Sequence, residues 1–210
     1  MECKTNFYNN GIINNKSYYN EEGKLHNLNG PALVDYKEDG TTLLEVYYVN
    51  GVKCNPSGGP VSIVYNMDGI KVAEEFTNKR ITYYENQNIE SIYYYNDMGQ
   101  YHNSNGPAVI DYYINGAVAK EEYYINGKHR EGAAIITYNT DGTILEEKYF
   151  NKFGWYMVST TEALRILQNT IVEENKEDML RALEQIAIKS NLEDKAQEIA
   201  EKLILIELLK

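Results

Sequence analysis

Between residues 7 and 154, apolar and polar positions alternate in short runs, and Asn-Gly or Asp-Gly dipeptides separate many of these runs. Alternation with a period of two is typical of β-strands, and these dipeptides tolerate the positive φ angles of two-residue type I′ hairpin turns. The dipeptides are Asn10-Gly11, Asp39-Gly40, Asn50-Gly51, Asp68-Gly69, Asn115-Gly116, Asn126-Gly127 and Asp141-Gly142. Their regular occurrence predicts an antiparallel meander of hairpins.

The hairpins belong to a repeat. Residues 18–36 return 76 residues later as residues 94–112, with Tyr-Tyr-Asn, Gly, His-Asn, Asn-Gly-Pro-Ala and Asp-Tyr at matching positions. A unit of about 29 residues occurs roughly four times, with half-units at residues 1–17 and near residues 70–93. Because such a unit buries its apolar face only by stacking on its neighbours, the sequence predicts one elongated array.

Both strands of the unit carry a recurring pattern on one face. The first strand has a small or branched residue, a branched residue and a tyrosine at alternate positions: Ala32/Val34/Tyr36, Val61/Ile63/Tyr65, Ala108/Ile110/Tyr112 and Ala134/Ile136/Tyr138. The second strand has an aliphatic residue, a glutamate and an aromatic residue: Leu43/Glu45/Tyr47, Val72/Glu74/Phe76, Ala119/Glu121/Tyr123 and Leu145/Glu147/Tyr149. Two-residue turns would set Tyr36 opposite Leu43 and Glu45 opposite Val34, and likewise in the other units. We expect this recurring face to be packed and the variable face to be solvated.

The pattern becomes helical after Trp155. Ser159-Thr160-Thr161-Glu162 forms a capping box, and the apolar spacing that follows predicts three short helices. The predicted fold is therefore mainly β with an α tail: an elongated sheet of repeated hairpins over residues 1–154 and a helical segment over residues 155–210. The last helix is apolar on more than one face between Leu203 and Leu209, and we expect it to cap the sheet. Docking of a partner is the alternative.

Composition narrows the range of partners. The chain has a formal net charge of −11 and contains 20 tyrosines, against 4 phenylalanines and 1 tryptophan. Tyrosine suits strands in contact with water, because its ring covers apolar surface while its hydroxyl stays hydrated. The acidity argues against direct nucleic-acid binding, which needs clustered Lys and Arg. It favours a protein partner with a basic surface, or solubility alone.

Cysteine usage and hydropathy predict the compartment. Cys3 and Cys54 are isolated and lack metal-ligand spacing, so we expect no metal site, no disulfide framework and a reducing environment. The first residues contain no apolar signal region, and no segment has the length of a membrane span. These observations predict a cytoplasmic protein.

Charged and aromatic strand residues are the candidates for binding. The recurring Glu45, Glu74, Glu121 and Glu147 would form a negative stripe facing a basic surface, with about 9.5 Å between adjacent columns. This spacing does not suit paired-carboxylate catalysis. The plainer alternative is that each glutamate bonds a tyrosine hydroxyl or a lysine of its own unit. The tyrosines expected to be exposed at an interface are Tyr48, Tyr95, Tyr113 and Tyr124.

The histidines do not form a recognisable catalytic set. His26 and His102 share one repeat position, where another unit has Cys54. A residue that recurs once per unit is most simply explained by its own loop, for example by bonding the Asn-Gly-Pro turn. Nucleotide-binding, zinc and serine-nucleophile motifs are absent. We therefore expect no enzyme and no cofactor. A catalytic alternative needs a deep pocket where His26, Cys54, His102 or His129 meets the glutamates.

Two phrases characterise the hairpins: Tyr-Tyr-Ile-Asn-Gly-Lys-His-Arg at residues 123–130, and Asn-Gly-Pro-Ala at residues 29–32 and 105–108. With these phrases, residues 7–154 resemble the MORN-repeat variants of bacterial and phage proteins, some of which are labelled antitoxin or immunity components. The resemblance implies an elongated antiparallel sheet that mediates contacts with proteins or membranes. The ordinary MORN unit is shorter and richer in Gly and Trp than the unit of this chain.

Together these features favour a non-catalytic protein-binding module that acts as a stoichiometric inhibitor by occluding its partner's surface. The partner would be a toxin, or a nucleic-acid-handling defence enzyme such as a CRISPR nuclease, whose phosphate channel the carboxylates would occupy. The alternative is an assembly or membrane-associated scaffold that docks, or forms a homo-oligomer, through the last helix.

Overall fold

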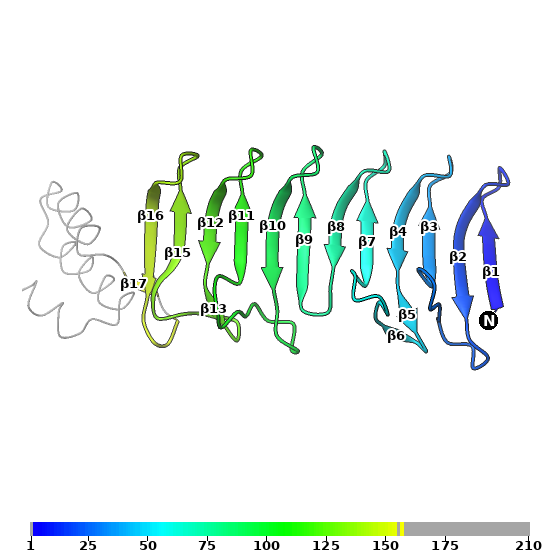
Figure 1. Cartoon of the computed structure of the whole chain (residues 1–210), viewed down its shortest axis with the longest axis horizontal. Coiled ribbons are helices and arrows are strands. Elements are labelled where there is room, and N and C mark those ends of the chain that lie inside the picture. Colours follow the sequence, from blue (N-terminus) through cyan, green and yellow to red (C-terminus); the bar gives the residue numbers. More distant parts are fainter. Residues whose placement is uncertain (1, 155, 158–210) are drawn as a thin grey trace, which may run out of the picture.

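The computed structural model describes residues 2–154, 156 and 157, and these residues form a long, single-layered antiparallel sheet (Figure 1). The main sheet has 13 strands, which pair in the order in which they follow along the chain. The prediction of a mainly β fold of repeated hairpins is therefore confirmed for this part of the chain. The predicted helices, and docking through the last of them, lie outside the described residues.

Two kinds of strand build this part of the chain. The main sheet contains β1 (Glu2–Phe7), β2 (Ile13–Tyr19), β3 (Leu33–Tyr36), β4 (Thr42–Val46), β7 (Ser62–Tyr65), β8 (Lys71–Glu75), β9 (Lys79–Tyr83), β10 (Ile89–Tyr94), β11 (Val109–Tyr112), β12 (Val118–Glu122), β15 (Gly132–Tyr138), β16 (Ile144–Phe150) and β17 (Tyr156–Met157). Two short ribbons pair β5 (Tyr48–Val49) with β6 (Val52–Lys53) and β13 (Tyr124–Ile125) with β14 (Lys128–His129). Figure 1 shows the tight hairpin turns at one end of the strands and the ribbons at the other end. We call these two margins the hairpin-turn edge and the ribbon edge.

Burial is shared between the two faces of the sheet. Val34 (7% exposed) and Ala108 (0%) are buried on the recurring face, and Val46 (6%) and Ala73 (3%) are buried to the same extent on the variable face. The prediction that the variable face is the solvated one is therefore wrong. A single layer has no interior, so its side chains are buried by neighbours on the same face, and no large side chain of the described residues is fully buried.

Alternation of large and small residues explains how a single layer buries its alanines. Ala108 lies between Tyr94 of β10, whose amide donates to the Ala108 carbonyl (2.7 Å), and Tyr123, which follows the last residue of β12. Ala32 lies in the same way beside Tyr18, whose amide donates to the Ala32 carbonyl (2.8 Å). Both alanines are 0% exposed. The tyrosine side chains of neighbouring strands thus take over part of the role of a second layer.

The type I′ prediction is confirmed at two of the seven dipeptides and wrong at five. Asn50 (φ 51°) and Asn126 (φ 48°) have positive φ angles together with the glycines that follow them, as a type I′ turn requires. At the other five dipeptides only the glycine has a positive φ. In the first complete unit, for example, the Gly40 amide donates to the Lys37 carbonyl (2.9 Å). These loops have three residues, a type I turn followed by a glycine bulge.

The bulge changes the pairing next to each turn and leaves the centre of the strands in the predicted register. Tyr36 lies opposite Thr42 rather than Leu43, because the pairing shifts after Asp35. The corresponding tyrosines of the later units shift in the same way. Glu45 lies opposite Val34 as predicted, and the three other recurring glutamates also lie opposite the predicted isoleucines.

Gly69→Ala is expected to destabilise the sheet by about 1 kcal/mol more than Gly40→Ala. Both glycines have positive φ angles (77° and 89°), so alanine costs about 1 to 2 kcal/mol of backbone strain at either position. A Cβ on Gly69 would also lie 2.9 Å from Cγ2 of Thr41, whereas one on Gly40 would meet nothing within 4 Å. Denaturant unfolding measures the difference, and Thr41→Ser should abolish it by removing that methyl group. An equal loss at both glycines would contradict this account.

Candidate functional site

A continuous row of paired residues crosses the recurring face from β2 to β16. The row consists of Lys16, Val34, Glu45, Ile63, Glu74, Ile81, Ile92, Ile110, Glu121, Ile136 and Glu147. All four predicted glutamates therefore lie in one row on one face. With strands about 4.8 Å apart, Glu45 is about 9.6 Å from Glu74, and Glu121 the same distance from Glu147. Strands β9 and β10 lie between Glu74 and Glu121 and double the gap there.

Three of the glutamates accept a hydrogen bond from a tyrosine of the next strand in the sheet. The hydroxyl groups donate from Tyr65 to Glu45 (3.2 Å), from Tyr83 to Glu74 (2.5 Å) and from Tyr138 to Glu121 (2.8 Å). The geometry recurs because each tyrosine lies two positions beyond the isoleucine that pairs with the glutamate. We call these three the tyrosine–glutamate pairs.

The prediction that each glutamate bonds a tyrosine or lysine of its own unit is confirmed for three of the four. Glu74 accepts from Lys71 (2.9 Å), Glu121 from Tyr123 (2.9 Å) and Glu147 from Tyr149 (2.8 Å). For Glu45 the prediction is wrong, because its tyrosine belongs to the following unit. The cross-strand donors Tyr65, Tyr83 and Tyr138 are the residues that sequence reasoning missed. For Tyr65 and Tyr138 the available signal was their recurrence at the end of a first strand, whereas Tyr83 lies in the half-unit and carried no such signal.

Lys71 joins one of the three tyrosine–glutamate pairs. Its Nζ lies 2.9 Å from Oε1 of Glu74 and 4.3 Å from the ring centroid of Tyr83. Burial alone would raise the pKa of Glu74, but the hydrogen bonds from Lys71 and Tyr83 outweigh it and hold that pKa below its usual value. Glu74 therefore stays ionised, and the charge of Lys71 largely neutralises it.

The other three glutamates of the row lack an ion-pair partner such as Lys71 among the described residues. No lysine or arginine of the described residues forms an ion pair with Glu45, Glu121 or Glu147. Hydroxyl groups bond their carboxylates without cancelling the charge. The recurring face therefore presents carboxylates among tyrosine rings, and we call it the tyrosine–glutamate face.

The four tyrosines predicted to be exposed are half-buried, and they lie away from the glutamate row. Tyr48 and Tyr124 begin the short ribbons, and the Tyr124 hydroxyl donates to Glu122 (2.8 Å) on the face opposite Glu121. Tyr95 stacks on Tyr101, with ring centroids 5.4 Å apart. Tyr113 lies at the hairpin-turn edge, where its hydroxyl donates to the Tyr138 carbonyl (2.6 Å). The contact of Tyr113 reaches the adjacent hairpin, whereas those of Tyr95 and Tyr124 are made with residues close in sequence.

Part of the tyrosine population is expected to ionise late in an alkaline titration. Burial, then Glu45, raises the pKa of Tyr65 to about 12, and burial together with the hydrogen bond to Glu121 raises the pKa of Tyr138 to about 12. Because both values lie above the ordinary value of 10.0, their contribution to stability is complete below pH 10 and is lost between pH 10 and about 12. The near-ultraviolet absorbance of tyrosinate follows this step. Tyr65→Phe with Tyr138→Phe should reduce the late fraction, and an unchanged late fraction would contradict the assignment.

The repeated histidines bond the type I′ turns and not the Asn-Gly-Pro turn as predicted. The Asn50 amide donates to Nδ1 of His26 (3.1 Å), and the Asn126 amide donates to Nδ1 of His102 (3.1 Å). The Asn-Gly-Pro turn is closed by the preceding asparagine: Nδ2 of Asn27 donates to the Pro31 carbonyl (2.9 Å). The recurrence of His26 and His102 therefore reflects their role in holding these loops, as the sequence pattern suggested.

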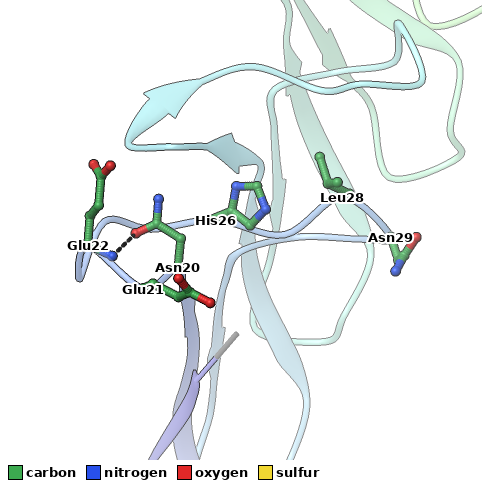
Figure 2. A pocket seen from close by; sticks show the side chains of 6 residues that line it. All are labelled: Asn20, Glu21, Glu22, His26, Leu28 and Asn29. Atoms are coloured by element: carbon green, nitrogen blue, oxygen red, sulfur yellow. Dashed lines mark hydrogen bonds between the residues drawn. The ribbon is translucent and has the colours of Figure 1, made fainter.

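A shallow hollow of about 430 Å³ lies beside His26. Figure 2 shows Asn20, Glu21, Glu22, His26, Leu28 and Asn29 around it, with the carboxylates of Glu21 and Glu22 pointing to different sides. The Glu22 amide donates to Asn20 (3.0 Å), so this asparagine closes the local turn. The four glutamates of the row and Cys54 do not line this hollow.

The opposite face carries a stack of rings near its ribbon edge. Successive centroids are 5.4 Å apart from Tyr101 to Tyr124, 4.2 Å from Tyr124 to His129 and 4.0 Å from His129 to Phe150. Burial lowers the pKa of His129, and the carboxylate of Glu122, 3.6 Å from Nε2, opposes this only in part. Since each ring covers its neighbour, the stack stabilises the ribbon rather than offering free ring faces.

Two further findings concern the described part of the chain alone. No group of three or more His, Cys, Asp or Glu residues there has the arrangement of a metal site. None of its segments forms a helix with the length and apolar character needed to cross a membrane.

The comparisons with known proteins give no assignment. No protein-family model matches the chain, and no curated protein matches it.

Proposed function

We propose that this chain is a non-catalytic protein-binding module that covers a basic surface of its partner with the tyrosine–glutamate face. The row of four glutamates on one face carries this proposal. Three of these carboxylates have no ion-pair partner among the described residues. Lysine or arginine side chains of a partner would therefore meet negative charge that the chain itself does not neutralise. Tyrosine rings on either side supply contact area at a small cost in side-chain entropy.

The mode of action that fits such a face is stoichiometric inhibition by occlusion. The sheet is long and single-layered, and a surface of this kind covers an extended area of a partner rather than enclosing a small ligand. The resemblance of residues 7–154 to MORN-repeat variants, some of them labelled antitoxin or immunity components, supports the same reading. A toxin, or a defence enzyme with a basic channel for nucleic acid, is the partner class we propose.

The test is purification of the complex from the native host, followed by measurement of affinity across a range of salt concentrations. We expect one predominant partner with a basic surface, whose affinity falls as salt rises, because screening weakens attraction between exposed charges. Addition of the chain in equimolar amount should inhibit the partner's activity. A partner without a basic surface, or an affinity that salt does not change, would refute the proposed face.

A further inference from the structure

One tyrosine–glutamate pair shows how a cation is bound on this face. The Lys71 Nζ lies against the Glu74 carboxylate at 2.9 Å and over the Tyr83 ring at 4.3 Å. The ammonium group thus receives both a charge-assisted hydrogen bond and the negative face of an aromatic ring. The contact needs a lysine three positions before the glutamate and the bulge between them, which sets Lys71 opposite Tyr65 and so on the same face as Glu74.

The two other pairs repeat this register, and no lysine or arginine of the described residues pairs with their carboxylates; Arg130 lies instead over the ring of Tyr123, which also donates to Glu121. Glu45 with Tyr65 and Glu121 with Tyr138 repeat the pairing register and the hydroxyl-to-carboxylate bond. The residues three positions before these glutamates are Thr42 and Val118, in place of a lysine. No basic residue of the described chain forms an ion pair with either glutamate.

We propose that the Glu45–Tyr65 and Glu121–Tyr138 pairs are two cation niches that bind lysine or arginine side chains of one extended segment of the partner. In each niche the ammonium or guanidinium group would take the place that Lys71 takes beside Glu74 and Tyr83. This inference rests on the proposed function and makes it specific. The two niches bind the partner's cations, and the Glu74–Tyr83 pair between them is already neutralised by Lys71.

The distance between the niches indicates the conformation of the segment. Strands β4 and β12 are six strand spacings apart in the sheet, which corresponds to about 29 Å. Nine residues of polyproline II span about 28 Å and make three whole turns, so residues nine apart lie on the same side. Figure 1 shows the antiparallel strands side by side with their axes nearly aligned, so a straight segment can cross them along the row.

The aromatic residues of the face repeat with the period of the same helix. One row has an aromatic residue on every second strand: Tyr18, Tyr47, Phe76, Tyr94, Tyr123 and Tyr149. Two strand spacings are about 9.6 Å, and one polyproline II turn is about 9.3 Å. Seven residues of an α-helix advance about 10.5 Å, which is about 0.9 Å more than two strand spacings. Over the five intervals of the row this difference adds up to about 4.5 Å, so an α-helix loses register with the rings. A polyproline II segment therefore stays in phase with the rings, and aromatic surfaces are the usual docking sites for this conformation.

The probe for the niches is a proline-rich peptide with two lysines nine residues apart, compared with a peptide of the same composition whose lysines are adjacent. Binding of the full chain to each peptide is measured by calorimetry. We expect the spaced peptide to bind about tenfold more tightly, since only it engages both niches at once. Equal affinities, or no binding of the spaced peptide, would overturn the proposal.

Lysines built into the chain provide the matching variant. Thr42→Lys with Val118→Lys places a lysine three positions before Glu45 and Glu121, as Lys71 stands before Glu74. These side chains should fill both niches and abolish the tenfold preference for the spaced peptide. Met67→Lys with Met98→Lys adds the same charge at exposed loop positions and should preserve the preference. A preference that survives in a folded Thr42→Lys, Val118→Lys variant would overturn the niches.

A second variant separates failure of the niches from failure of the proposed function. Glu45→Gln with Glu121→Gln keeps an oxygen for each tyrosine hydroxyl and removes the niche charge. If the host partner binds this variant and the wild type with equal affinity, but binds a variant lacking all four row glutamates more weakly, the face is correct and the niches are not. If neither variant weakens binding of the partner, both proposals fail.

Discussion

Ala108→Leu is expected to lower the free energy of unfolding by about 1 to 3 kcal/mol. Ala108 is 0% exposed although it lies in a single layer, and we attribute this burial to the large side chains beside it on the two neighbouring strands. Tyr94 lies beside it on one neighbouring strand and Tyr123 beside it on the other, both on the same face of the sheet. Because Ala108 has no exposed surface, the additional atoms of a leucine must displace neighbouring side chains or strands.

Ala119→Leu is the matched control for this result. Ala119 lies on the neighbouring strand β12 and is half-buried, so a larger side chain can extend into solvent. Denaturant unfolding of both variants should show a loss for Ala108→Leu and a change within about 0.5 kcal/mol for Ala119→Leu. Equal losses would mean that β-propensity and not coverage by the tyrosines determines stability in this sheet.

Glu45→Gln, Glu121→Gln and Glu147→Gln, combined in one variant, are expected to weaken the complex with the partner by about 10-fold to 100-fold. Each removed charge is a partly exposed carboxylate without an ion pair among the described residues, and contacts of this kind contribute about 0.5 to 1 kcal/mol each. Glutamine retains an oxygen that accepts the tyrosine hydroxyls, so the sheet should stay intact. Affinity for the purified partner is the measurement.

Neighbouring glutamates of the opposite face provide a control with the same net charge. Glu75, Glu122 and Glu146 each lie next to a glutamate of the row and, because side chains alternate along a strand, point to the other face. Replacing these three with glutamine changes the total charge equally. If both triple variants weaken the complex to the same extent, only net charge matters and the tyrosine–glutamate face is not the binding surface.

Local patterns predicted the centre of each hairpin well and its turns less well. The assumption of two-residue turns placed Glu45 opposite Val34 and predicted the same register in the later units, and this held because the bulge affects only the pairs next to each turn. The dipeptide alone did not distinguish a two-residue turn from a three-residue turn with a bulge, because both place the glycine at positive φ. The difference depends on the residue before the glycine: Asn50 and Asn126 have positive φ, and the residues before the five other glycines do not.

Contacts between hairpins were harder to predict than contacts within them. The bond from Tyr65 to Glu45 joins two units. The burial of Val46 on the variable face also comes from neighbouring strands. Each of these features depends on which strands are adjacent and how they are aligned, and residue spacing along one strand contains no such information.

Spacing along the chain was sufficient to establish the hairpin repeat, the central register of its strands and the shared face of the four glutamates, because alternation and turn chemistry act over a few residues. Three-dimensional pairing was needed to reveal which tyrosine bonds which carboxylate, that Lys71 occupies one of the three tyrosine–glutamate pairs, and that side chains are buried on both faces. These properties arise between strands, where side chains far apart in sequence come within contact distance of one another.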